Sequence, residues 1–215
     1  MMPEVEDLTM HLAELAKIEV VPHTLFRMAD DTLCYITRRI DRTADGEKIA
    51  MEDMCQLTER QTEYKYKSSY EKIGKTIKQF SSLSKMDVTN YFEVLLFSWL
   101  TGNNDMHLKN FSLYEPKDAI RLTPGYDLLN AAIINSKDDE ELALTLNGKK
   151  KKLTRQDFIA SGVNMGIEQR TVDLLIAKYK KLQPKMNDLV NRSFLSDELK
   201  SSYIALLSER LDRLG

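Results

Sequence analysis

Three polar residues in the middle of the sequence have the types and spacing that phosphoryl transfer uses. Asp105 and Asn110 directly follow an apolar run, and Asp127 follows a predicted β-hairpin. In phosphoryl transfer one carboxylate accepts or orients the hydroxyl proton of the attacking group, while an amide oxygen and a second carboxylate hold Mg²⁺ against the nucleotide phosphates. The D-x-x-x-x-N spacing equals that of the protein-kinase catalytic loop. If the hairpin returns Asp127 to Asn110, both side chains can reach one metal ion.

Two neighbouring side chains each have two interpretations. Lys109 could neutralise charge on the transferring phosphoryl group, or it could be a solvated surface lysine. His107 could orient Asp105, or it could hold the loop through backbone hydrogen bonds. The pattern also has a purely structural explanation, because an Asp and an Asn at this spacing often occur by chance. Asp127 could then simply cap a helix that begins near Leu128.

The elements that must position these residues are mainly helical, since the chain has only 8 glycines and 5 prolines. Apolar spacing predicts helices over residues 4–17, 51–59, 69–83 and 86–102, and three more helices between residues 154 and 215. The helix over 86–102 is apolar nearly all round, so we expect it at the centre of the fold. We expect Asp87 to cap this helix and Gly102 to end it in a left-handed turn.

The predicted strands are few and short. Residues 32–40 alternate and predict one strand, and "FSLYE" and "AIRLTP" predict two more, joined by a turn over "EPKD". Asn147-Gly148 predicts a tight hairpin turn. In the helix over 69–83 we expect Ile73, Ile77 and Phe80 to point inward, and we expect Thr154 and Ser196 to cap later helices. These elements predict one α+β unit that is mostly helical.

Composition excludes several classes of protein. The chain has 31 Lys plus Arg against 33 Asp plus Glu, so charge gives no reason to expect direct nucleic-acid binding. Two cysteines and three scattered histidines make no zinc spacing that we recognise, and no disulfide framework is implied. The first residues lack a hydrophobic signal core, and no run of 18 apolar residues exists. We therefore expect a cytoplasmic protein without a membrane span.

Two charged segments remain open to interpretation. The basic run Lys149–Lys152 could be a solvated hairpin arm or a patch for an RNA-linked or acidic substrate. The alternation of tyrosine and lysine in "EYKYKSSY" could bind phosphate or a protein partner, or it could be an exposed loop of amphipathic side chains.

Longer stretches resemble a known family. "FSWLTGNNDMHLKNFSLYE" and "IRLTPGYDLLNA" resemble the catalytic segment of the HipA family of bacterial serine/threonine kinases, the toxins of HipBA and split HipBST modules. "PEVEDLTMHLAELAKIEVVP" is similar to the helix that begins the family's C-terminal part, and "YITRRIDR" is similar to its hinge segment. "IAMEDMCQLTERQTEYKY" resembles a further family stretch. The resemblance runs from residue 3 to about residue 180.

The resemblance implies a role for each polar residue of the loop. Asp105 would be the catalytic base, and Asn110 and Asp127 would bind Mg²⁺. His107 and Lys109 fall on family motif positions near the phosphates, so we include both among the catalytic residues.

The resemblance also implies a nucleotide site, substrates and partners. The backbone of Arg38, Arg39 and Ile40 would meet the adenine of ATP, and Asp41 would contact the ribose. The family fold is two-lobed and protein-kinase-like, with a mostly helical large lobe. Its targets are aminoacyl-tRNA synthetases, phosphorylated on serine, and its partner is the helix-turn-helix antitoxin HipB.

The sequence departs from the family pattern at its start. We find no glycine-rich phosphate loop and no strand lysine ahead of the first helix, and Glu6 stands where the family's helix acid would pair with that lysine. Val5 and Ile40 replace the usual Asn and Phe. We therefore expect residues 1–42 to form the first helix and hinge and residues 43–215 the helical large lobe, with the small lobe largely missing. A separate polypeptide could complete the kinase, the chain could be truncated, or it could survive as a catalytically incomplete module that binds an antitoxin or a small-lobe protein.

Overall fold

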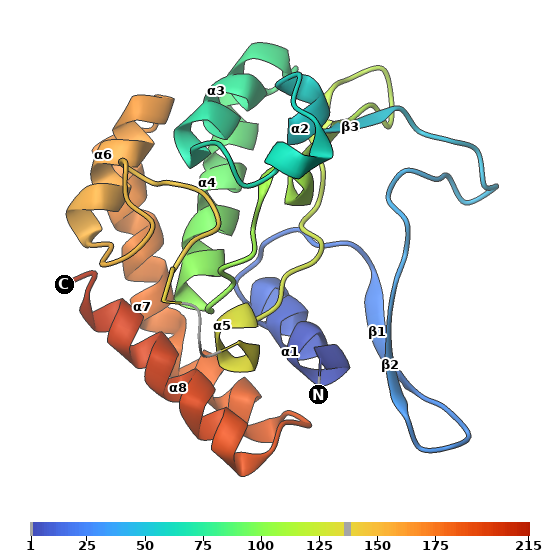
Figure 1. Cartoon of the computed structure of the whole chain (residues 1–215), viewed down its shortest axis with the longest axis vertical. Coiled ribbons are helices and arrows are strands. Elements are labelled where there is room, and N and C mark those ends of the chain that lie inside the picture. Colours follow the sequence, from blue (N-terminus) through green and yellow to red (C-terminus); the bar gives the residue numbers. More distant parts are fainter. Residues whose placement is uncertain (1, 136–138) are drawn as a thin grey trace.

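A computed structural model describes residues 2–135 and 139–215 of the chain. Eight α-helices make up about half of this part, and five short strands lie to one side of them (Figure 1). The helices are α1 (Met2–Leu15), α2 (Met54–Leu57), α3 (Tyr70–Phe80), α4 (Ser84–Leu100), α5 (Ala131–Ile134), α6 (Arg155–Met165), α7 (Gln169–Arg192) and α8 (Asp197–Asp212). The expected mostly helical α+β class is confirmed. Within the described ranges, every helix is too short or too polar to cross a bilayer.

The strands form two small antiparallel sheets. β1 (His23–Arg27) pairs with β2 (Leu33–Thr37) in a hairpin that stands out from the helical body (Figure 1). β3 (Met51–Asp53), β4 (Ser112–Tyr114) and β5 (Arg121–Leu122) form the second sheet in that order. The sequence prediction missed β1. It also assigned residues 51–53 to a helix, whereas they pair with β4 and the helix begins only at Met54.

Helix α4 lies at the centre of the helical body, as its apolar pattern predicted. Its buried side chains include Phe92, Leu96 and Trp99, and α3, α6 and α8 pack around it. The Trp99 indole donates to Glu141 Oε2 at 2.9 Å, and the Arg213 guanidinium lies 5.3 Å from the indole ring. The C-terminal end of α4, where the polar loop begins, is therefore held by both the 139–153 segment and α8.

Asp87 is not the cap of α4, since the helix begins three residues earlier, at Ser84. Its carboxylate is almost fully buried and pairs with Arg121 at 3.2 Å. It also accepts from the Ser81 hydroxyl at 2.6 Å and from the Leu122 backbone N–H at 2.9 Å. Asp87 thus fastens β5 to α4, which places the strand that leads to Asp127.

Several local predictions have clear outcomes. Ile73 and Ile77 are buried, but Phe80 ends α3 and is 40% exposed, so its predicted inward position is wrong. Asn147 and Gly148 make the predicted tight turn, with φ of 49° and 76°. Thr154 and Ser196 are the N-caps of α6 and α8, as predicted.

Candidate active site

The loop after α4 begins with a turn that only glycine fits. Gly102 has φ of 82°, and a Cβ on it would lie 2.4 Å from Asn130 Oδ1. The Gly102 carbonyl accepts from the Ala132 backbone N–H at 3.0 Å. This close approach joins the start of the loop to the segment that follows Asp127.

Asn103 links the two parts of the predicted site. It is almost fully buried; its Oδ1 accepts from the Asp105 backbone N–H at 3.3 Å, and its Nδ2 donates to the Asp127 carbonyl at 3.3 Å. Further along, the buried Tyr70 hydroxyl donates to the Met106 carbonyl at 2.9 Å. These bonds satisfy several of the polar groups of a loop that is largely buried, and they give it a fixed shape.

Asn110 and Asp127 lie in direct contact. Asn110 Nδ2 donates to Asp127 Oδ2, while Asn110 Oδ1 accepts from the His107 backbone N–H at 3.1 Å. Asp127 has φ of 56°, a left-handed conformation that Asp tolerates better than most residues and that is frequent at functional sites. Asp127 does not cap α5, because Asn130 does so through its Oδ1.

The backbone before Asp127 is fixed by the segment between α1 and β1. The Gly125 N–H donates to the Glu19 carbonyl at 2.8 Å, and the Val21 N–H donates to the Gly125 carbonyl at 3.0 Å. On the other side, the Tyr126 hydroxyl donates to the Lys109 carbonyl at 3.0 Å. Hydrogen bonds made by the two preceding residues, Gly125 and Tyr126, therefore hold Asp127 in position.

Asp105 is exposed at the rim of the loop and is held by a tyrosine from another segment. Its Oδ1 accepts from the Tyr66 hydroxyl at 2.8 Å. Partial burial, followed by this hydrogen bond to Asp105, raises the pKa of Tyr66 to about 12. The Tyr66 ring packs edge-on against His107 at 5.1 Å. Tyr66 thus contacts Asp105 and His107, two of the three residues that the sequence proposed for catalysis.

His107 is mostly buried, and within the described ranges its ring makes no hydrogen bond to Asp105. Burial lowers the pKa of His107, and the charge of Lys65 lowers it further, so the ring is neutral near pH 7. Its backbone N–H bonds Asn110, which matches the interpretation that His107 shapes the loop.

Lys109 pairs with an acid from a distant element. Its Nζ lies 2.5 Å from Asp53 Oδ2, and this hydrogen bond raises the pKa of Lys109. Asp53 also caps α2, since it accepts from the Gln56 backbone N–H at 3.0 Å. Lys109 is therefore a cation of the loop whose position is fixed by Asp53.

A pocket of about 440 Å³ lies between the predicted hinge and the loop. The hinge contributes Arg38, Arg39, Ile40 and Asp41. The other lining residues are Val21, Thr37, Lys48, Met51, Asp53, Gln56, Lys109, Ser112 and Tyr126. Asp105, Asn110 and Asp127 do not line this pocket, but their chain neighbours Lys109 and Tyr126 do.

Asp41 is the most strongly paired acid of the hinge. Arg39 donates to both of its carboxylate oxygens, at 2.9 and 2.7 Å, and Arg42 lies at 2.7 Å. The hydrogen bond from Arg39 lowers the pKa of Asp41 to about 2. The carboxylate is therefore ionised at neutral pH. Asp41 and Arg39 both line the pocket.

Residues 1–186 match the family described as the HipA-like C-terminal domain. The chain belongs to the HipA family. Curated relatives include the protein named "Putative kinase Y4dM" of Sinorhizobium fredii, 29% identical over 166 residues that make up 76% of this chain and 39% of the relative. A second, named "Putative kinase", from Haemophilus influenzae, is 28% identical over 144 residues, 59% of this chain and 42% of the relative. The HipA-family chain thus spans about two fifths of the length of these relatives.

Two solved structures share the fold. A chain in the Shewanella oneidensis complex of HipA, HipB and operator DNA superposes with a TM-score of 0.82 at 19% identity, covering 98% of this chain and 55% of that one. The Helicobacter pylori proinflammatory kinase CtkA superposes with a TM-score of 0.65 at 13% identity, covering 99% of this chain and 80% of that one. At these identities the likeness shows a kinase-like fold, and it fits a C-terminal lobe.

The first helix adds an acid with an unusual environment to this HipA-family site. Burial and, to a smaller extent, the negative charge of Asp127 together raise the pKa of Glu6 to about 7. Among residues 2–135 and 139–215, no cation forms an ion pair with Glu6. The carboxyl of Glu6 is therefore near Asp127 but uncompensated.

Asp53, Tyr66 and Tyr126 contact the loop, and the sequence analysis did not select them individually. Asp53 carried a usable signal, because Asp53 and Gln56 form the D-x-x-Q pattern of a capping box, which predicts a helix start at Met54. Tyr66 lies in the tyrosine and lysine segment noted above, but nothing local marks it as the partner of Asp105. Its contact depends on the tertiary fold.

The basic run is largely neutralised within the fold. Lys149 pairs with Asp157 at 2.8 Å, Lys150 with Glu140 at 2.9 Å and Lys151 with Asp139 at 2.5 Å. This pairing favours the interpretation as a solvated hairpin arm.

Proposed function

We propose that this HipA-family chain is the C-terminal part of a Mg-ATP-dependent serine/threonine protein kinase of a bacterial toxin–antitoxin module. The observation that carries the proposal is the contact between Asp127 and Asn110, which brings an acid from a separate segment to the loop that holds Asp105. In this proposal residues 1–42 supply the first helix and hinge, and residues 43–215 supply the large lobe.

Asn110 and Asp127 have the donor atoms that Mg²⁺ prefers, an amide oxygen and a carboxylate. The amide nitrogen of Asn110 now faces Asp127, so binding of the ion would replace that hydrogen bond. The ion would neutralise charge on the nucleotide phosphates. Asp105, on the exposed rim, would accept the proton of the attacking hydroxyl, and Tyr66 would hold the carboxylate in place.

The hinge pocket is the proposed nucleotide site. Adenine would meet the backbone of Arg38–Ile40, and Asp41 would accept from a ribose hydroxyl while it remains paired with Arg39 and Arg42. Lys109, which lines the same pocket and adjoins Asn110, would lie on the phosphate side, with His107 behind it. This order follows the pocket from hinge to loop.

We propose the family's partners for the complete protein. These are a HipB-like helix-turn-helix antitoxin, a protein substrate such as an aminoacyl-tRNA synthetase in the bacterial cytoplasm, and a small lobe that supplies a cation. Glu6 supports the last of these, because a carboxyl with a raised pKa beside Asp127 would be stabilised by a lysine. The small lobe could belong to the same polypeptide or to another.

Phosphoryl transfer is tested by Asp105→Asn in the protein together with its small lobe. The amide keeps the shape and can still accept from Tyr66, but it cannot take a proton, so we expect phosphotransfer from radiolabelled ATP to fall about 10²–10⁴-fold. Asp188→Asn, an exposed acid on α7, is the matched control and keeps full activity. Equal activity of Asp105→Asn and its parent would show that Asp105 is not the base.

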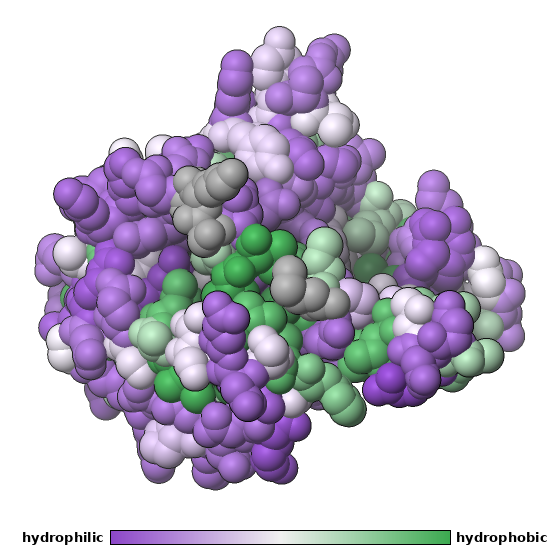
Figure 2. Space-filling model, turned by 60° about the horizontal axis from the view of Figure 1, so that its bottom comes forward, coloured by the Kyte–Doolittle hydropathy of each residue, from purple (hydrophilic) through white to green (hydrophobic). Residues whose placement is uncertain are grey.

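A second candidate function is a module that binds a partner without transferring phosphate. It is favoured by apolar side chains on the outer face of the β1–β2 hairpin, where Phe26 is 55% and Ile36 51% exposed. Figure 2 shows hydrophobic atoms on this arm as well as in a patch at the centre of the face. Calorimetry with Mg-ATP separates the two candidates. Binding that Asp127→Asn abolishes supports the kinase, and no binding in any form supports the module.

A further inference from the structure

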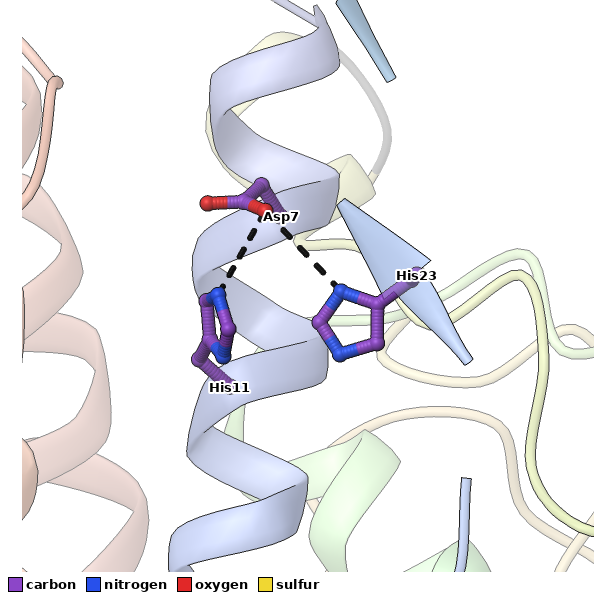
Figure 3. Close-up of side chains that lie close together, drawn as sticks. All are labelled: Asp7, His11 and His23. Atoms are coloured by element: carbon purple, nitrogen blue, oxygen red, sulfur yellow. Dashed lines mark ion pairs between the residues drawn. The ribbon is translucent and has the colours of Figure 1, made fainter. Parts of the chain in front are cut away.

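Two of the three histidines of the chain meet at the seam between α1 and β1. His11 lies one helical turn after Asp7 on α1, and His23 begins β1. Figure 3 shows both imidazoles facing the carboxylate of Asp7 from adjacent elements. One ligand atom from each of the three residues lies within 4.8 Å of the others. The group is separate from the loop that holds Asp105.

Three polar atoms of this group, one on Asp7 and two on His23, are buried without hydrogen-bond partners among the described residues. The His23 side chain is only 1% exposed, yet neither of its ring nitrogens has a hydrogen bond, and Asp7 Oδ1 has none either. His11 Nε2 lies 3.5 Å and His23 Nδ1 3.9 Å from Asp7 Oδ1. Both separations exceed the usual N–H···O distance, so these buried atoms of Asp7 and His23 remain without a hydrogen bond.

We propose that Asp7 Oδ1, His11 Nε2 and His23 Nδ1 bind one transition-metal ion of the Zn²⁺ type. Two ligands about 2.1 Å from a tetrahedral zinc ion lie about 3.4 Å from each other, which is close to the two observed separations. Two imidazoles and one carboxylate are a common zinc ligand set and leave a fourth position for solvent. The half-exposed His11 side chain provides the path by which the ion enters.

Glu14 approaches both rings from the opposite side and forms a hydrogen bond with the ring of His11. Its carboxylate lies 2.8 Å from His11 Nδ1 and 3.5 Å from His23 Nε2. A carboxylate on the far nitrogen places the proton there and leaves the near nitrogen free to bind metal, which is how outer carboxylates support zinc-binding histidines.

The ion would clamp the hairpin to the first helix. Strand alternation directs His23, Leu25 and Tyr35 toward α1, and His23 is paired with Thr37 at the end of β2. The Arg38 N–H donates to the Pro22 carbonyl at 2.9 Å, so the hinge is fixed directly to the residue before His23. A metal at this seam therefore fixes the base of the hinge that lines the pocket. No zinc-binding spacing is visible in the sequence because the third ligand, His23, comes from the element that follows α1.

Metal binding is tested with tag-free protein stripped of metal and titrated with Co²⁺, a spectroscopic substitute for zinc. We expect visible d–d bands that saturate at one ion per chain and disappear when Zn²⁺ is added. His11→Ala and Asp7→Asn should each weaken binding about 100-fold or more, because even loss of an outer partner costs about 10–100-fold. His11 is half-exposed and Asn is isosteric with Asp, so both variants are expected to fold.

Two control variants locate the ion. His107→Gln tests the remaining histidine, and Asp127→Asn tests the proposed nucleotide-linked metal site; both should bind Co²⁺ as the parent does. Near-ultraviolet thiolate bands would instead assign the ion to Cys34 or Cys55 and overturn the proposal. Binding that survives His11→Ala, or the absence of any d–d band, would overturn it as well. None of these readouts involves phosphotransfer, so the result of the Co²⁺ titration is independent of the proposed kinase activity.

Discussion

The loop over residues 101–113 and the seam between α1 and β1 both bury polar side chains, but they differ in how those side chains are satisfied. In the loop, Asn103 and Asn110 bond backbone and side-chain partners within the chain. At the seam, His23 and Asp7 keep buried atoms without a hydrogen bond. Fully paired groups specify one geometry, whereas unpaired ones cost free energy until a partner binds. Asn103 and Asn110 therefore preorganise the loop, where His107 Nδ1 is buried without a hydrogen bond, whereas at the seam both ring nitrogens of His23 and one oxygen of Asp7 are left without one.

The largest stability effect should come from breaking the paired region at Asn103. Asn103→Ala leaves the Asp105 N–H and the Asp127 carbonyl without their partner inside the fold, so we expect a loss of about 2–3 kcal/mol in the free energy of unfolding. Urea unfolding measures it. Asn164→Ala, at an exposed position of α6, is the matched control and should change stability by less than about 0.5 kcal/mol. A similar loss in both variants would mean that the loop is not held by Asn103.

The sequence could predict the paired region because its signals are local. The helix over 86–102 is apolar nearly all round, Gly102 marks its end, and the D-x-x-x-x-N spacing selects Asp105 and Asn110. The return of Asp127 followed from a short hairpin between two strands. In each case the residues that form the sequence pattern and the structure that the pattern predicts lie in the same stretch of the chain.

The remaining features depend on contacts between distant segments. β1 is short and its outer face is exposed, so neither length nor periodicity revealed it, and with it the position of His23 was missed. Phe80 matched the inward face of its helix, yet it lies at the last position of α3, where the core ends. Tyr66 and Asp53 reach the loop from segments that single-sequence patterns do not connect to it.

An intermediate effect is expected from the uncompensated acid of the first helix. The folded pKa of Glu6 is about 7, above the usual 4.5, so the folded protein binds this proton more tightly than the unfolded chain. The stability that this proton contributes is complete below pH 4.5 and is lost as the pH rises through 7. Glu6→Gln should therefore be more stable than the parent by about 1–2 kcal/mol near pH 8, a value reduced for partial solvent exposure.

Unfolding curves of Glu6→Gln and its parent across this pH range test the prediction, since the difference between them isolates Glu6 from Asp7 and the histidines. Exposed Glu52→Gln is the matched control and should follow the parent at every pH. Parallel curves for Glu6→Gln and the parent would show that the carboxyl is solvated like any surface glutamate. A small lobe that supplies a cation should abolish the difference.

The smallest effect should come from the rim of the paired region. Tyr66→Phe keeps the ring against His107 but removes the hydroxyl that donates to Asp105, so we expect a loss of about 0.5–1 kcal/mol, because the bond is partly exposed. Tyr64→Phe is the control, since the Tyr64 hydroxyl makes no hydrogen bond within the described ranges. In the proposed kinase the same change would free the Asp105 carboxylate, so the loss of phosphotransfer, expressed as a free energy of activation, should exceed the loss in the free energy of unfolding. Loss of stability without loss of rate would mean that Tyr66 packs the loop and does not position Asp105.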